Sequence, residues 1–114
     1  TQALQKFEDA LKAHPEIDTI FSLESIGGVA AANAVEELGL EGKVTILAID
    51  DNADTIQYVK DGKIWATMAQ NFYKMGYTAG EFAVKYLNGE EVESVVDSGT
   101  VLITAENVDT YSFE

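Results

Sequence analysis

The sequence predicts an α/β fold, a doubly wound parallel sheet with helices on both faces. Short apolar runs alternate with longer stretches of helical periodicity, which is typical of strands joined by helical crossovers. The run from Val44 to Ile49 is apolar at nearly every position, as expected for a strand covered on both faces. Several runs stop at polar residues, and in open α/β sheets ligands bind where the strands end.

The composition limits both the fold and the partners. At 114 residues the chain forms at most one ordinary domain, and a hydrophobic fraction of 46% is enough for a core. The net charge of −13 argues against nucleic acid or an anionic membrane as a partner. The chain has no cysteine for a disulfide or a thiolate metal site, and no run reaches the roughly 18 apolar residues of a membrane span.

The chain opens with a predicted helix from Thr1 to His14, in which apolar residues recur at helical spacing. Pro15 ends this helix, because the residue before a proline avoids the helical region. The first predicted strand is Ile17 to Leu23. A second helix is expected from Ile26 to Leu38, with Ser25 as its N-cap.

Two glycines fall in the first turn of this second helix. Gly27 and Gly28 are poor helix formers, so a separate reason for their presence is needed. Either they let the backbone approach a ligand closely, or they let the helix pack closely on a strand. Both explanations carry equal weight at this point.

The middle of the chain predicts two further strands with a helix between them. After the strand Val44 to Ile49, Asn52 is a suitable cap for a helix from Ala53 to Asp61. The third strand is Ile64 to Ala69. This succession repeats the first strand–helix unit and supports the parallel arrangement.

A long helix from Tyr73 to Leu87 follows the third strand. It combines a face of glycine and alanine with several aromatic residues, and we expect this stripe to pack in a core rather than to form a ligand platform. The acidic stretch Glu90 to Asp97 is interpreted as a solvated connection. A short final strand is predicted from Thr100 to Thr104.

A polar residue follows each of the three main strands: Glu24, Asp50 and Gln70. Because the carboxyl ends of parallel strands meet at one edge, we expect these side chains to converge there. Carboxylates and carboxamides offer the acceptors and donors that sugar hydroxyls need. We therefore predict Glu24, Asp50 and Gln70 as ligand-binding residues. Ser25 and Asn52 are candidates for secondary contacts, although helix capping is their favoured role.

A calcium site is a weaker alternative at the same strand end. Asp50, Asn52 and Asp54 match the opening of a calcium-binding loop. The match then fails, because the sixth position is Thr55 instead of glycine and the twelfth is Asp61 instead of glutamate. The sequence therefore predicts no metal site.

A phosphoacceptor receiver domain is a distant alternative, since that fold also places acids at strand ends. It needs a lysine at a later strand end, where this chain has Gln70. Enzymatic signals are weaker still, because the chain has no cysteine, no G-x-S-x-G motif and no phosphate loop, and the single histidine, His14, lies in a loop. We predict neither an enzyme nor a cofactor.

Three segments carry a resemblance to a known family. They are HPEIDTIFSLESIGGVAAANAVEELG, VTILAIDDNADTIQYVKDGKIWATMAQN and LITAENVDTY. Together they resemble the C-terminal portion of ribose-binding-like sugar-binding proteins of the periplasmic binding protein type I superfamily. The resemblance covers nearly all of residues 3 to 111, and its most specific part is the succession of a strand ending in ID, a helix and DGKI-ATMAQ.

The resemblance implies two doubly wound lobes with a sugar bound between them. In ribose-binding-like members an aspartate and a glutamine of this half bind the sugar, and these positions fall on Asp50 and Gln70. The family asparagine falls on Glu24 and the following aspartate on Ser25. These two departures point away from ribose and toward another polyol, an aminated sugar or a different polar ligand.

The resemblance also predicts how the chain is organised. In the family a strand normally precedes the helix at Thr1 to His14, so residues 1–114 are expected to be a single partial solute-binding domain. Residues 1–71 would supply the strands and helices of the C-terminal lobe. Residues 72–114 would supply a hinge crossing, a helix of the other lobe and the C-terminal tail.

The function implied by the resemblance is that of the substrate-binding component of an ABC importer. Its partners would be a sugar-like ligand and a membrane permease, in a periplasmic or extracellular setting and with a lipoprotein anchor as an option. A homo-oligomer of the isolated chain is also expected. A ligand-sensing domain of a signalling protein or a repressor-type effector domain is the alternative, although LITAENVDTY resembles the transport proteins more.

Overall fold

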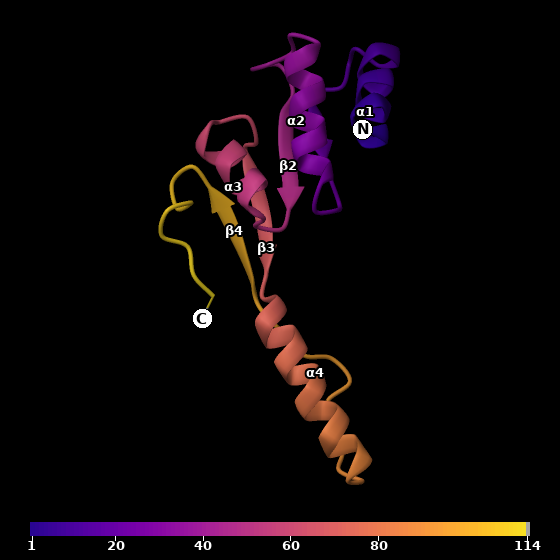
Figure 1. Ribbon diagram of the computed structural model, residues 1–114, viewed down its shortest axis with the longest axis vertical. Helices are drawn as coiled ribbons and strands as arrows, with labels where there is room; N and C mark the ends of the chain where they lie inside the picture. Colours follow the sequence, from indigo (N-terminus) through magenta and orange to yellow (C-terminus); the bar gives the residue numbers. More distant parts are fainter. Residues whose placement is uncertain (114) are drawn as a thin grey trace.

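The computed structural model describes residues 1–113. Helices and strands alternate along them, and the long helix α4 extends away from the rest of the molecule (Figure 1). The elements are α1 (Gln2–Ala13), β1 (Thr19–Phe21), α2 (Gly27–Glu37), β2 (Thr45–Ile49), α3 (Ala53–Lys60), β3 (Ala66–Gln70), α4 (Phe72–Leu87) and β4 (Thr100–Thr104).

The four strands form one sheet in the order β1-β2-β3-β4. β1, β2 and β3 are parallel, with Ile20 paired to Ile46 and Ile49 paired to Met68, which confirms the predicted α/β class. β4 is antiparallel to β3. The prediction of a parallel sheet is therefore wrong for this strand. The reason is the path of α4, which leaves the carboxyl end of β3, so that the returning chain enters the sheet from that same end (Figure 1).

The helices cover one face of this sheet within the described residues. α2 packs on β2, α3 packs on β3 and β4, and α1 packs on α2. Ile46, Ala48 and Ile103 are buried in the resulting core. On the opposite face Phe21 is 59% exposed and Leu102 is 45% exposed. The predicted layer of helices on this second face is therefore not found in residues 1–113.

The two glycines at the start of α2 are explained by close packing. Both are buried, and a Cβ atom at Gly28 would lie 2.6 Å from the Cβ of Ala48 on β2. A Cβ atom at Gly27 would lie 2.1 Å from the Oγ of Ser22. The absence of side chains lets the helix start directly against β2, so a ligand is not needed to account for these residues.

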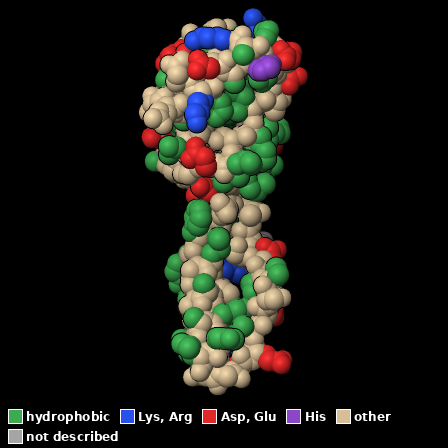
Figure 2. All heavy atoms as spheres, turned by 90° about the vertical axis from the view of Figure 1, so that its right-hand side faces the viewer, with side chains coloured by type: hydrophobic (Ala, Val, Ile, Leu, Met, Phe, Trp, Pro, Cys, Tyr) green, Lys and Arg blue, Asp and Glu red, His purple; other side chains and the backbone are tan. Residues whose placement is uncertain are grey.

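The helix α4 has no buried residue, which differs from the predicted packing of its aromatic stripe in a core. It accounts for the elongated shape, 57 × 30 × 22 Å, and Figure 2 shows hydrophobic side chains on the surface of this projecting part. Tyr73 is 82% exposed and Leu87 is 83% exposed. An apolar pattern predicts a face suited to burial but not what covers that face.

The packing of α2 on β2 gives a stability prediction. Replacing Gly28 by alanine forces α2 away from Ala48, and overpacking of this kind lowers the free energy of unfolding by about 1–3 kcal/mol. The matched control is Gly76→Ala on α4, where no atom lies within 4 Å of the added Cβ and helix propensity favours alanine. Urea unfolding followed by circular dichroism measures both. An unchanged midpoint for Gly28→Ala would contradict the close packing.

Candidate functional site

Two of the three predicted binding residues meet at the carboxyl edge of the sheet. Asp50 follows β2, and Gln70 is the last residue of β3, the neighbouring strand. The Nε2 atom of Gln70 donates a hydrogen bond of 2.8 Å to Oδ1 of Asp50. Both residues are half-buried. The convergence expected from the parallel arrangement is therefore present for this acid–amide pair.

The backbone of Asp50 adopts a left-handed conformation, with φ of 73°. This region is costly for most residues, although aspartate and asparagine tolerate it better. The carbonyl oxygen of Asp50 accepts a hydrogen bond of 2.7 Å from the Thr67 hydroxyl, and its amide donates one of 2.9 Å to the carbonyl of Met68. Thr67 is fully buried, so β3 fixes the turn from which the Asp50 carboxylate projects. The sequence reasoning missed Thr67, whose signal is a single hydroxyl inside an apolar strand.

Glu24 lies at the same edge, but its carboxylate binds a backbone amide at the start of α2. Its Oε2 atom accepts a hydrogen bond of 3.3 Å from the amide of Ile26, the N-cap residue of α2. Within residues 1–113 it forms no hydrogen bond to Asp50 or Gln70. The prediction of Ser25 as N-cap is wrong, because α2 begins one residue later than the cap preference suggests and the neighbouring carboxylate binds the amide instead.

Asn52 connects two of the turns at this edge. Its Oδ1 accepts a hydrogen bond of 3.0 Å from the amide of Thr55, which confirms the predicted cap of α3. Its Nδ2 donates a hydrogen bond of 2.9 Å to the carbonyl of Ser25. Both ends of the side chain are thus bound to backbone groups, and the turn after β1 is joined to the turn after β2.

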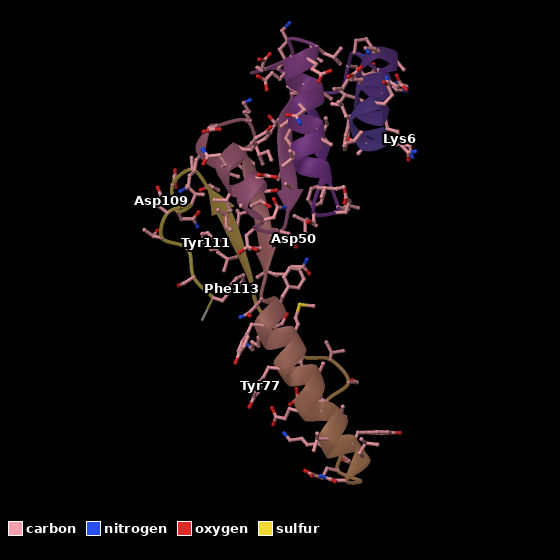
Figure 3. The ribbon with its side chains drawn as sticks, viewed as in Figure 1. Lys6, Asp50, Tyr77, Asp109, Tyr111 and Phe113 are labelled. Carbon is pink, nitrogen blue, oxygen red and sulfur yellow. The ribbon has the colours of Figure 1, made fainter. Side chains whose placement is uncertain are left out.

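A third contact at this edge comes from the C-terminal tail. The hydroxyl of Tyr111 donates a hydrogen bond of 3.0 Å to Oδ2 of Asp51 (Figure 3 shows Tyr111 beside the segment that carries Asp50). Burial, and then the hydrogen bond to the Asp51 carboxylate, raises the pKa of Tyr111. The sequence reasoning did not find this contact, because its two partners lie far apart in the chain.

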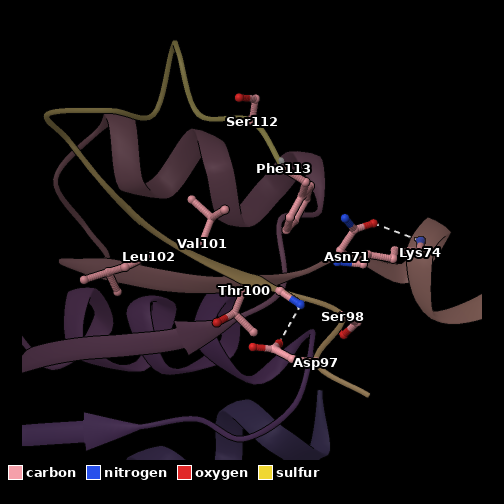
Figure 4. A pocket seen from close by; sticks show the side chains of 10 residues that line it. Asn71, Lys74, Asp97, Ser98, Thr100, Val101, Leu102, Ser112 and Phe113 are labelled. Carbon is pink, nitrogen blue, oxygen red and sulfur yellow. Dashed lines mark hydrogen bonds between the residues drawn. The ribbon is translucent and has the colours of Figure 1, made fainter. Parts of the chain in front are cut away.

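A separate open cavity of about 520 Å³ lies beside the start of α4 (Figure 4). It is lined by Asn71, Lys74, β4 residues such as Thr100, and Phe113 of the tail. The Asn71 side chain caps α4 by accepting a hydrogen bond of 2.9 Å from the amide of Lys74. None of the three predicted binding residues lines this cavity, so it is distinct from the acid–amide pair.

The weaker calcium alternative does not fit the local structure. Asn52 is used as the cap of α3, and Asp54 lies in the first turn of that helix, where a calcium loop would have to run. Across residues 1–113 no three histidine or acidic side chains are grouped closely enough to hold a metal ion. The carboxylates of Asp50 and Asp51 each accept a hydrogen bond at this turn.

The fold and the acid–amide pair are typical of an α/β lobe that binds a polar small molecule at its carboxyl edge. The chain belongs to the family of the periplasmic binding protein domain, whose family model matches residues 1–91.

Curated relatives support this membership. The ribose import binding protein of Salmonella typhimurium is 32% identical over 94 residues, which cover 82% of this chain and 31% of the relative. The ribose import binding protein of Bacillus subtilis is 29% identical over 104 residues, covering 91% of this chain and 33% of the relative. The chain spans about a third of the length of these relatives.

Solved structures agree. A glucose-galactose binding protein from Geobacillus stearothermophilus superposes with a TM-score of 0.90 at 30% identity, covering 95% of this chain and 39% of that protein. A periplasmic solute binding protein of an ABC transporter from Actinobacillus succinogenes, with bound D-allose, gives a TM-score of 0.84 at 35% identity, covering 96% and 39%. These relatives are solute-binding proteins rather than enzymes, and they favour the solute-binding interpretation over the repressor-type and receiver alternatives.

The geometry at Asp50 gives a binding prediction. In the full-length protein Asp50→Gly removes the carboxylate but keeps the left-handed backbone, and a polar ligand that this carboxylate binds through charge-assisted hydrogen bonds of about 2–3 kcal/mol should lose affinity by roughly 30- to 150-fold. Glu41→Gly, at an exposed site away from the edge, is the control and leaves the affinity unchanged. Calorimetry that finds wild-type affinity in Asp50→Gly would remove this residue from the site.

Proposed function

We propose that this chain is part of the substrate-binding component of an ABC importer and that it binds a sugar-like solute. The observation that carries the proposal is the hydrogen-bonded pair of Asp50 and Gln70 at the carboxyl edge of the sheet. The family membership and the sugar-binding relatives support it. The solute would lie at this edge, between the lobe that contains the sheet and an opposing lobe.

The acid–amide pair has the chemistry that a sugar requires. Gln70 uses one N–H to orient Asp50 Oδ1, and residues 1–113 supply no further hydrogen bond to Asp50 Oδ2 or to the amide oxygen of Gln70. The pair therefore presents acceptors from both residues and the second amide N–H as a donor, within one fixed arrangement. A polyhydroxylated ligand can pair with all of these groups, whereas a ligand without hydroxyls would leave them desolvated and unpaired.

The proposed division of the chain follows from α4. Residues 1–71 form the binding half, and residues 72–114 provide the crossing to an opposing lobe, one of its helices and the tail. No residue of α4 is buried, which supports this division, because a helix of 16 residues with exposed aromatic and aliphatic side chains needs a surface to pack on. We propose that the opposing lobe supplies that surface in the full-length protein.

The proposed partner of the full-length protein is a membrane permease, which would receive the solute on the periplasmic or extracellular side. No helix within residues 1–113 combines the length and the apolar character needed to cross a membrane. A lipid anchor outside these residues is the proposed means of membrane attachment. Interaction with nucleic acid is disfavoured by the net charge of −13.

A thermal-shift screen of the full-length protein tests the proposed function. Sugars, polyols and amino sugars are added at millimolar concentration, and a ligand that binds the folded state raises the melting temperature. Because the family asparagine is replaced by Glu24, we expect the best ligand to differ from ribose. A screen in which no sugar, polyol or amino sugar stabilises the protein would contradict the proposal.

The same screen separates two roles of Glu24. If the ligand carries an amine, Glu24→Gln should reduce its affinity far more than that of a neutral sugar, because only the charged carboxylate attracts an ammonium group. Calorimetry with a matched pair, an amino sugar and its parent sugar, measures the difference. Equal losses for both would leave Glu24 as the group that binds the Ile26 amide at the start of α2.

The isolated chain should behave differently from the full-length protein. Its α4 and the open face of its sheet expose apolar side chains, among them Tyr73 and Phe21, which favours pairing with a second copy. We expect oligomers by light scattering, and sugar affinity well below that of the full-length protein because the opposing lobe is missing. A stable monomer with full affinity would show that residues 1–114 form a complete binding unit.

A further inference from the structure

The turn that follows β4, residues 105–111, contacts both ends of α3. At the start of the helix Tyr111 binds Asp51, and at its end Nζ of Lys60 lies 2.5 Å from Oδ1 of Asp109. Between these contacts Val108 is buried, with 6% of its surface exposed. The turn is thus packed against the core, and its two polar contacts lie at opposite ends of α3.

The turn is also fixed internally. Oδ1 of Asn107 accepts a hydrogen bond of 2.8 Å from the amide of Thr104, and its Nδ2 donates one of 2.9 Å to the carbonyl of Leu102 on β4. The amide of Tyr111 donates a hydrogen bond of 2.9 Å to the carbonyl of Asn107. The Tyr111 side chain therefore extends from a turn that is hydrogen-bonded to β4.

The contact of Tyr111 with Asp51 matters because two carboxylates are adjacent at this turn. Asp50 receives its donor from Gln70, and Asp51 receives its donor from Tyr111. Asp51 directly follows Asp50 in the chain, and the hydrogen bond from Tyr111 fixes the direction of the Asp51 carboxylate, which carries the same charge as that of Asp50. A phenol is protonated at neutral pH, and burial, together with the Asp51 carboxylate, raises the pKa of Tyr111 further, so the donor is present.

We propose that Tyr111 is a positioning residue for the ligand-binding edge. By binding Asp51 it separates the two carboxylates and keeps Asp50 paired with Gln70, so the tail sets the affinity for the solute without contacting it. This inference rests on the proposed function, because solute affinity is the property that Tyr111 changes. It also predicts that removing the Tyr111 hydroxyl loosens the backbone at Asp50 and Thr55, an effect that can be measured without a ligand.

The test compares two variants of the same turn in the full-length protein. Tyr111→Phe removes only the hydroxyl that binds Asp51, and it should weaken binding of the sugar found by thermal shift about five- to tenfold, less than the full effect of a hydrogen bond to a charged group because Tyr111 acts only through Asp51. Lys60→Met breaks the contact with Asp109 at the other end of α3 and should leave the affinity unchanged. A double-mutant cycle completes the test: in an Asp51→Ala background, Tyr111→Phe should have no further effect.

A second readout is independent of the ligand. Hydrogen exchange of the Asp50 and Thr55 amides, which are bonded at this edge, should accelerate in Tyr111→Phe and not in Lys60→Met. Equal losses of affinity in the two variants, or unchanged exchange in Tyr111→Phe, would overturn the inference. Wild-type affinity in Tyr111→Phe, together with lost binding in Asp50→Gly, would overturn it while the proposed function stands. If the wild-type protein binds no sugar, the proposed function fails, and exchange alone decides whether Tyr111 fixes the turn.

Discussion

The left-handed backbone at Asp50 is the constraint on which the acid–amide pair at the carboxyl edge depends. β2 must end there, and the chain must turn into α3 while the carboxylate stays beside Gln70. This conformation costs an ordinary L-residue roughly 1–2 kcal/mol, which hydrogen bonds from Thr67 and to Met68 offset. The strand that supplies the amide of the pair therefore also fixes the backbone of the acid, so the two groups cannot move independently.

Most polar residues at this edge serve the fold. Asn52 bonds backbone groups with both ends of its side chain, Glu24 binds the amide of the N-cap residue of α2, and Asp51 is bound by Tyr111. These contacts connect the turns after β1 and β2 with the C-terminal tail. The pair of Asp50 and Gln70 differs, because its members bond each other and retain hydrogen-bonding atoms to which the described residues supply no partner. The proposed ligand contacts are therefore few among the polar residues of this edge, and the others support the turns.

The α/β class, the parallel direction of the three main strands and the cap at Asn52 could be predicted from the sequence, because each depends on local pattern or on simple rules of connection. The acid–amide pair followed from the same rules. The start of α2 could not be assigned, because the preference of serine for the N-cap does not fix a helix start to one residue, and the N-cap is Ile26 instead of Ser25. The contact of Tyr111 spans 60 positions, and no local pattern contains such information. The direction of β4 depends on where α4 leaves the sheet, which is also a property of the whole chain.

The junction between β3 and α4 has a mechanical consequence. Gln70 ends β3 and Asn71 caps α4, so no flexible linker separates the acid–amide pair from this helix of 16 residues. A helix of this length is about 24 Å long, and a rotation of about 5° at its base displaces its tip by about 2 Å. Gln70 pairs with Thr100, the first residue of β4, so the returning chain enters the sheet at the same point. Any rotation of α4 at this junction would therefore act directly on Gln70, the amide of the pair.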